Sequence, residues 1–285
     1  MKLGISTYSL FGAIRSGEMS VLDVIDWIAD QGGEHVEIVP IGYNLHESPD
    51  LIEKIRAKAA DRGLDISNYA VGGNFAVGDD AAVEAEIKRL MGEVDIARAL
   101  GVKRMRHDVA SGSDVSTARF QRELPKLAEA CRRVAEYAAG FGIVTSLENH
   151  GYFMQGSERV LALIDAVGSP NFKLTLDVGN FMCADENSVA AVKRAIGQAS
   201  IVHLKDFYLR PSYRQPGEGW FPTTAGNYLR GAIFGHGDID TPEVMRVVKA
   251  SGFDGYLSLE FEGMEDCRVG ARIGLANAKR LWAEA

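Results

Sequence analysis

The run Ile143-Val144-Thr145-Ser146-Leu147-Glu148-Asn149-His150-Gly151 begins with apolar residues that favour a β-strand. A carboxylate, Glu148, and an imidazole, His150, lie where the apolar part ends. Three later segments, 172–177, 200–206 and 255–260, have the same form. Each is short, is bounded by Gly, Pro or a polar turn, and ends near a residue that can bind a metal through oxygen or imidazole nitrogen. We therefore expect four strand ends to share one site.

The rest of the chain alternates in the same way between short β-rich runs and longer amphipathic runs. Such alternation predicts parallel strands joined by helical crossovers. The strands are nearly continuous in apolar character, which is typical of strands covered on both faces. The expected strands are 3–8, 35–39, 64–70, 102–107, 143–148, 172–177, 201–205 and 256–261. The expected helices are 20–30, 48–62, 80–100, 116–140, 157–167, 187–198, one that begins near Thr241 as its N-cap, and 267–282.

Eight β-then-α units predict a single α/β domain over residues 1–285, a closed (β/α)8 TIM barrel with a long loop after strand seven. A doubly wound sheet is the main alternative. That fold usually has a Gly-rich phosphate loop after its first strand, whereas the corresponding turn here, 7–12, has no GxGxxG motif. The barrel also explains the four polar strand ends, because barrel enzymes carry their active sites at the carboxyl ends of the strands.

The composition restricts the partners that we expect. The 285-residue chain carries a net charge of −8, which disfavours nucleic acid and anionic membranes because both need clustered Lys and Arg. No stretch approaches the roughly 20 apolar residues of a membrane span, and the N-terminus does not resemble a signal peptide. Three scattered cysteines without CxxC spacing fit a reducing compartment, so we expect a cytoplasmic protein. A homo-oligomer is left open.

The predicted metal ligands are Glu148, Asp177, His203 and Glu260, which fall at the ends of strands five to eight. Any one of them could instead be a helix cap or a polar group at the barrel rim, but four such residues at one end of the barrel favour a shared site. The oxygen-rich set suits Mn²⁺ best, with Mg²⁺ or Co²⁺ as alternatives. Without a cation or protonation, the three converging carboxylates would repel one another.

Segments 146–151, 176–180, 202–206 and 259–260 together resemble those of the xylose-isomerase-like superfamily, which includes sugar isomerases, ketose 3-epimerases, inosose dehydratases and AP endonucleases. The resemblance extends over nearly the whole chain. It implies that the four ligands hold one divalent ion and that Glu148 and Glu260 also act as acid and base. Ketose 3-epimerases tend to have a histidine where this chain has Asn180. The DNA-repair branch needs additional metal-binding histidines, and this chain has six His in all.

The expected function is therefore a divalent-metal-dependent isomerase or epimerase that acts on a small sugar or polyol through an enediolate. Two carboxylates on different strands can reach opposite faces of one carbon, so one can remove a proton and the other can return it. The first alternative is a dehydratase of a keto-inositol or related cyclic ketone. The second is a non-catalytic sugar-binding module.

Further substrate contacts are expected from residues around this site, although a structural role stays open for each. His107 ends strand four, and Lys205 follows His203 by two positions and so points to the same side. In the long loop, Arg210 and Trp220 have the chemistry to bind anions and to stack on sugar rings, and His236 lies between two glycines.

Overall fold

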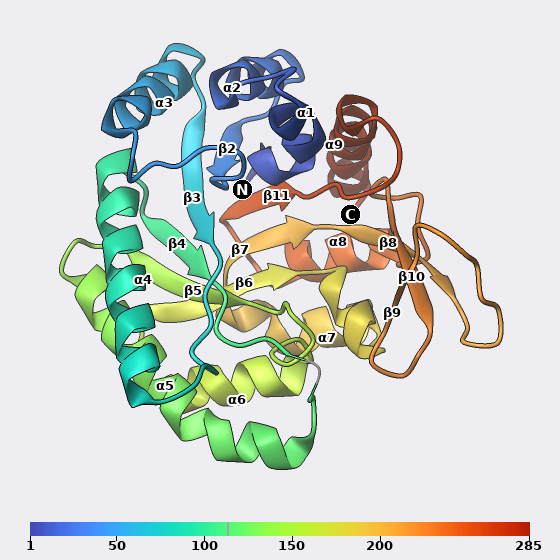
Figure 1. Ribbon diagram of the computed structural model, residues 1–285. Coiled ribbons are helices and arrows are strands. Elements are labelled where there is room, and N and C mark those ends of the chain that lie inside the picture. The colour runs from blue at the N-terminus through green and yellow to red at the C-terminus, as the bar shows by residue number, and fades with distance from the viewer. Residues whose placement is uncertain (113) are drawn as a thin grey trace.

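The computed structural model describes residues 1–112 and 114–285 and forms a closed barrel of parallel strands surrounded by helices (Figure 1). The strands neighbour one another in the order β1-β11-β7-β6-β5-β4-β3-β2. The predicted TIM barrel is confirmed. The barrel strands are β1 (Lys2–Ser6), β2 (His35–Ile38), β3 (Asp65–Val71), β4 (Arg104–His107), β5 (Val144–Glu148), β6 (Phe172–Asp177), β7 (Ala199–Leu204) and β11 (Tyr256–Leu259).

Residues 7–16 form helical turns where the sequence predicts a strand end and a turn, and the other helices begin and end close to the predicted positions. The helices are α1 (Phe11–Ser16), α2 (Val21–Asp30), α3 (Pro49–Asp61), α4 (Asp80–Leu100), α5 (Thr117–Ala139), α6 (Ser157–Val167), α7 (Ser188–Ala195), α8 (Thr241–Ala250) and α9 (Cys267–Glu284), with short 3-10 turns η1 (Thr7–Leu10), η2 (Asn180–Ala184) and η3 (Ile196–Gln198). Among the described residues, no helix is long and apolar enough to cross a membrane.

Two helix caps show how local chemistry sets these boundaries. Ser20, the first residue of the expected helix 20–30, caps α2, because its side chain accepts the Asp23 N–H while Asp23 accepts the Ser20 N–H. The predicted cap at Thr241 is wrong. Asp240 caps α8 instead and accepts the Glu243 N–H, which places Thr241 inside the first turn.

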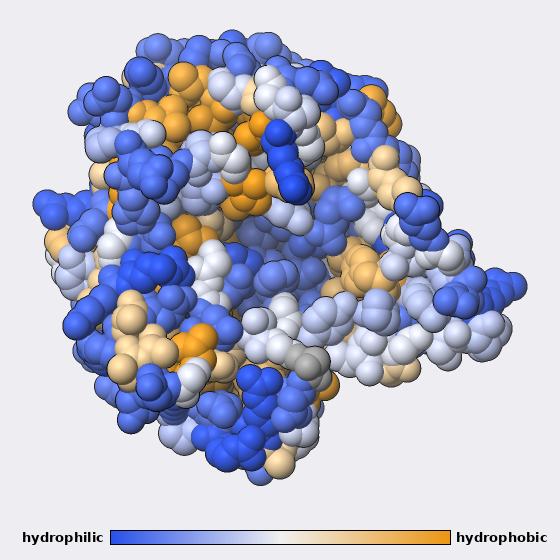
Figure 2. All heavy atoms as spheres, viewed as in Figure 1, coloured by the Kyte–Doolittle hydropathy of each residue, from blue (hydrophilic) through white to orange (hydrophobic). Residues whose placement is uncertain are grey.

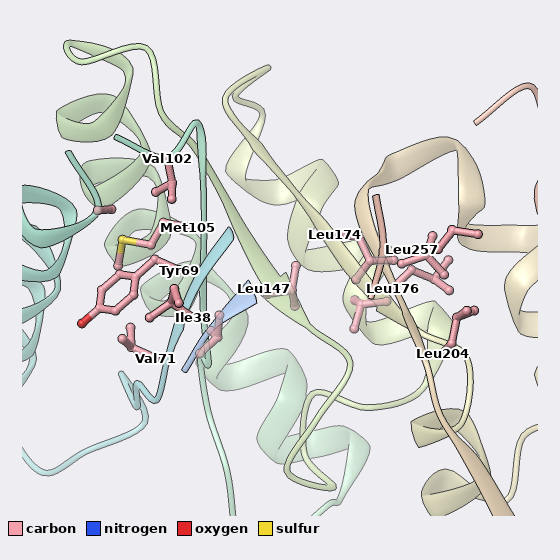
Figure 3. Packing of buried hydrophobic residues seen from close by; sticks show 14 of the residues in the cluster. Ile38, Tyr69, Val71, Val102, Met105, Leu147, Leu174, Leu176, Leu204 and Leu257 are labelled. Atoms are coloured by element: carbon pink, nitrogen blue, oxygen red, sulfur yellow. The ribbon is translucent and has the colours of Figure 1, made fainter. Parts of the chain in front are cut away.

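Alternation along the strands separates an apolar outer layer from a polar interior. Leu147, Leu174, Leu176 and Leu257 are fully buried in the hydrophobic core shown in Figure 3. The alternate residues face the barrel interior, where Ser146 Oγ lies 2.8 Å from Thr175 Oγ1. The predicted polar strand ends continue this inner face, and so they converge at the carboxyl end of the barrel.

The long segment after β7 is more regular than the sequence predicts. It contains a three-stranded antiparallel sheet in the order β8-β10-β9, which lies to the side of the barrel in Figure 1. The strands are β8 (Asp206–Arg210), β9 (Phe221–Pro222) and β10 (Tyr228–Ala232). Asp206 attaches this sheet to the barrel, because its carboxylate accepts the backbone N–H groups of Phe207, Gly235, Gly237 and Ile239.

Candidate metal centre and cavity

The structure brings the four predicted metal ligands together. Glu148 and Asp177 end β5 and β6, His203 is the penultimate residue of β7, and Glu260 directly follows β11. One ligand atom from each residue lies within 4.8 Å of the corresponding atom of every other, and all four side chains are buried. Their placement at neighbouring strand ends makes this cluster able to hold a metal ion.

His203 is oriented by a carboxylate that the sequence analysis missed. Its Nε2 lies 3.0 Å from Glu37 on β2, and Glu37 also accepts hydrogen bonds from Asn68 and Ser258. With Nε2 donating to Glu37, Nδ1 points toward the cluster, 3.4 Å from Glu260 Oε1. Burial opposes protonation of His203, but Glu260, Glu37 and Glu148 raise its pKa well above the ordinary value.

Two buried atoms of the cluster have no hydrogen-bond partner, and both belong to predicted ligands. They are His203 Nδ1 and Asp177 Oδ2. The other Asp177 oxygen accepts the N–H groups of Gly179 and Asn180 at 2.7 and 2.8 Å. Burial, together with repulsion from Glu148 and Glu260, raises the pKa of Asp177 to about 6 although Lys205 lowers it. Both atoms lie near a charged neighbour, since His203 Nδ1 is 3.4 Å from Glu260 and Asp177 Oδ2 is 3.2 Å from Lys205 Nζ. An imidazole nitrogen and a carboxylate oxygen are ligand types that a divalent cation takes.

Two basic side chains partly balance the negative charge of the cluster. Lys205 Nζ lies 3.2 Å from Asp177 and 3.1 Å from Glu260, so the predicted placement of Lys205 near the ligands agrees with the structure. Arg106, which the sequence analysis missed, lies 2.7 Å from Glu148 and 3.0 Å from Asp108. Burial opposes ionisation of Glu148, but Arg106 and His203 hold its pKa well below the ordinary value.

Asn180 is placed to orient Glu148. Its side-chain amide donates to Glu148 Oε1 at 2.9 Å. Asn180 occupies the position where ketose 3-epimerases tend to have a histidine. In this protein its amide therefore contacts a predicted metal ligand.

A cavity of about 400 Å³ opens beside the cluster. Figure 2 shows hydrophilic residues around a hollow in this face of the molecule. His150 lies on the cavity wall, with its Nδ1 3.1 Å from Asp108. The lining consists of Tyr8, Val39, Pro40, Ile41, Ala70, Val71, Gly72, Arg89, Glu93, Arg106, Asp108, Glu148, His150, Lys205, Glu260 and Glu262.

The remaining residues expected to contact substrate lie outside this lining. His107 is fully buried between Phe75 and Phe172, with ring centroids 5.9 and 6.0 Å away, because it points to the opposite side of β4 from Arg106. Arg210 of β8 stacks on the ring of Trp220, which precedes β9, at 5.4 Å, and His236 is exposed. Substrate contact by Arg210, Trp220 and His236 stays a prediction.

The sequence is similar to one protein family and to several characterised relatives. Residues 25–285 match the family model described as xylose isomerase-like TIM barrel. Over 257 residues the chain is 24% identical to a 3-oxo-isoapionate decarboxylase from Pectobacterium atrosepticum, covering 87% of this chain and 81% of that protein. It is 24% identical over 149 residues to an inosose dehydratase from Clostridium perfringens, covering 50% of this chain and 48% of that protein.

Solved structures with the same fold include a probable dehydratase and an epimerase. The probable 3-DHS dehydratase from Bacillus anthracis superposes with a TM-score of 0.76 at 19% identity, covering 98% of this chain and 99% of that chain. D-psicose 3-epimerase from Clostridium cellulolyticum H10 superposes with a TM-score of 0.74 at 16% identity, covering 99% of both chains. The likeness of these two structures shows the fold.

Proposed function

Because the chain belongs to the xylose isomerase-like TIM barrel family, we propose that it is a divalent-metal-dependent isomerase or epimerase of a sugar or sugar-like polyol. The observation that carries this proposal is the buried cluster of Glu148, Asp177, His203 and Glu260, in which one ligand atom of each residue lies within 4.8 Å of the others. The oxygen-rich ligand set favours Mn²⁺, with Mg²⁺ and Co²⁺ as alternatives. A divalent ion bound there would polarise a substrate carbonyl and stabilise the negative charge of an enediolate.

The protein side chains then have separate roles. Asp177 and His203 would mainly hold the ion, since Glu37 fixes the His203 ring and backbone N–H groups fix Asp177. Glu148 and Glu260 come from β5 and β11, with β6 and β7 between them in the barrel. They can therefore approach a substrate carbon from two sides, one removing a proton and the other returning it.

Basic groups beside the two glutamates would set their charge. The guanidinium of Arg106 keeps Glu148 ionised, as a proton acceptor must be at the start of the reaction. Lys205 lies against Glu260 and can also donate a hydrogen bond to a substrate hydroxyl at the cavity wall. The buried position of the cluster limits access of water to these groups.

A dehydratase of a keto-inositol or related cyclic ketone is the second candidate function. It needs the same proton removal but expels a neighbouring hydroxyl. The pair of His150 and Asp108 favours the dehydratase. This pair lies on the cavity wall beside Glu148 and can form a hydrogen bond with the hydroxyl that leaves. The similarity to an inosose dehydratase supports the same candidate.

The test is NMR of metal-loaded protein in D₂O with a panel of ketoses, inososes and dehydroshikimate. Exchange of a carbon-bound proton with a change in configuration or carbonyl position supports the isomerase or epimerase. Loss of water supports the dehydratase. Binding without exchange or water loss for every compound would contradict both and favour a sugar-binding module.

A further inference from the structure

A second cavity, of about 440 Å³, adjoins the cavity beside the metal cluster. Both cavities are lined by Tyr8 and Glu262, whose side chains are hydrogen-bonded to each other at 3.3 Å. Tyr8 follows β1 and Glu262 follows β11, so the second cavity also opens at the carboxyl ends of the barrel strands. The two cavities are therefore neighbouring compartments on one face of the barrel.

The Tyr8 ring connects the two compartments. Lys205 Nζ, which contacts the metal cluster, lies 5.9 Å from the centroid of this ring. The Tyr8 ring also stacks with Phe11 of α1, at 6.2 Å between centroids and 10° between planes. Phe11 and the buried Phe261 line the second cavity but not the first. This gives the second cavity an aromatic wall, and such walls pack well against the apolar faces of ring-shaped ligands.

The charges of the second cavity indicate which ligands suit it. Its carboxylates are Glu18, Glu262, Glu265 and Asp266, and its cation is Arg268. Arg268 is already paired, at 3.1 Å from Asp266 and 3.3 Å from Glu18. The N-terminus of α9 is also occupied, because Asp266 accepts the N–H groups of Arg268 and Val269. A phosphate or carboxylate would meet net negative charge, whereas the hydroxyl groups of an uncharged ligand can donate to carboxylates.

We propose that the second cavity is a subsite for an uncharged sugar or polyol unit, joined to the unit that reacts beside the metal cluster. The preferred substrate is then a two-unit, glycoside-like molecule, and a free monosaccharide, which fills only the first cavity, binds more weakly. Each cavity falls within the range of roughly 300–1,000 Å³ that is typical of ligand pockets. This inference rests on the proposed function, since it assigns the reacting unit to the first cavity.

The experiment is isothermal titration calorimetry of Mn²⁺-loaded protein with matched polyols that lack a carbonyl and so cannot turn over. Sorbitol and myo-inositol represent one unit, and maltitol and galactinol represent the same polyols carrying a second sugar. We expect each two-unit ligand to bind roughly tenfold more tightly than its one-unit counterpart, a difference of about 1.4 kcal/mol, because its second unit packs on the aromatic wall. Equal or weaker binding of both two-unit ligands would overturn the inference and leave the proposed function intact.

Two variants locate the subsite. Phe11→Ala removes part of the aromatic wall, and Gly12→Leu fills the cavity, since a Cβ at Gly12 would meet only Cys267 Sγ at 3.8 Å. Both should abolish the tenfold advantage of maltitol and leave the affinity for sorbitol unchanged. Phe11 is a half-buried ring beneath Arg15, at 5.5 Å. The matched control is Phe141→Ala, because Phe141 is a half-buried ring beneath Arg98, at 4.7 Å, but lines neither cavity.

The outcomes separate the two proposals. Equal weakening of sorbitol and maltitol by both variants would overturn the subsite. Failure of all four polyols to bind, together with absence of proton exchange for the ketose and inosose panel, would contradict the proposed sugar chemistry and the subsite with it.

Discussion

His203 Nε2 lies 3.0 Å from the carboxylate of Glu37, although the two residues are 166 positions apart in the sequence. Burial raises the pKa of Glu37, but attraction to His203 and hydrogen bonds from Ser258 and Asn68 lower it to about 2. Glu37 is therefore a fixed negative charge that sets which imidazole nitrogen faces the metal cluster. This relationship makes Glu37 a positioning residue for the proposed metal site.

Glu37→Gln should weaken Mn²⁺ binding by roughly 10- to 100-fold, because partners of metal-binding histidines orient the ring and raise its basicity. Calorimetric titration with Mn²⁺ measures this, and circular dichroism checks that the variant is folded. Glu84→Gln is the matched control, since Glu84 forms an ion pair with Arg133 on the outer helices. Equal Mn²⁺ affinity in wild type and folded Glu37→Gln would show that Glu37 does not position the ligand.

Glu148→Gln and Glu260→Gln should each lower the turnover rate by about 10²–10⁴, the usual contribution of a positioned acid or base. Glutamine keeps the shape and one coordinating oxygen, so both variants should retain appreciable metal binding. In D₂O the two variants should differ in proton exchange, because each retains one intact glutamate on a different side of the substrate. Wild-type turnover by both metal-loaded variants would show that neither carboxylate transfers protons.

Stability should fall in mild acid because His35 is buried and neutral. Burial lowers the pKa of His35 to about 4 although its Nε2 contacts the Leu257 carbonyl at 3.0 Å. Between the unfolded pKa of about 6.5 and this folded value, the unfolded chain binds more protons, so the free energy of unfolding decreases as the pH falls. The contribution of His35 that is lost between pH 6.5 and 4 is about 3 kcal/mol.

The measurement is urea unfolding at several pH values for wild type and His35→Gln. Between pH 6.5 and 4 the free energy of unfolding should change less steeply with pH in the variant than in wild type. The difference in slope corresponds to at most one bound proton. His107 has a similar pKa, lowered by burial to about 4, and should contribute a separate slope that persists in the variant. Identical slopes for the two proteins would contradict a neutral buried His35.

Asp206→Ala should destabilise the protein by on the order of 3 kcal/mol, because it leaves backbone N–H donors without their acceptor. The Asp206 carboxylate accepts from Gly235 at 2.9 Å and from Gly237 at 2.8 Å, which holds the side sheet and the following loop against β7. Asp206→Asn keeps one acceptor oxygen and should lose less. Thermal unfolding measures the stability of both variants. Equal stability of Asp206→Ala and wild type would show that the Asp206 carboxylate does not hold the side sheet in place.

The sequence predicted the barrel and the four candidate ligands because each ligand ends a short apolar strand. Only the polar residues at which a strand ends were considered, and Glu37 and Arg106 were missed because each is the third residue of a four-residue strand. Their charge was the available signal, since a charged residue in a strand covered on both faces must point into a polar interior. His107 was chosen over Arg106 because strand-end position was weighed without the alternation that determines which side chain points inward.

The side sheet was missed for a related reason. In β10 the buried Leu229 lies between the half-buried Tyr228 and Arg230, as expected of a strand with one covered face. In β8 this alternation is absent, because Asp206 and Phe207 are both buried and Leu209 is exposed. The aromatic and arginine side chains of the side sheet were interpreted as substrate contacts. The pairing of β8 with β10 joins positions on either side of a long connection, and sequence spacing alone does not specify such pairing.

The most direct test of the proposed metal centre is the anomalous diffraction of a crystal grown with Mn²⁺. We expect one peak within about 2.0–2.6 Å of side-chain atoms of Glu148, Asp177, His203 and Glu260. Density at another position, or these four side chains turned away from a common point in the Mn²⁺-grown crystal, would contradict this expectation.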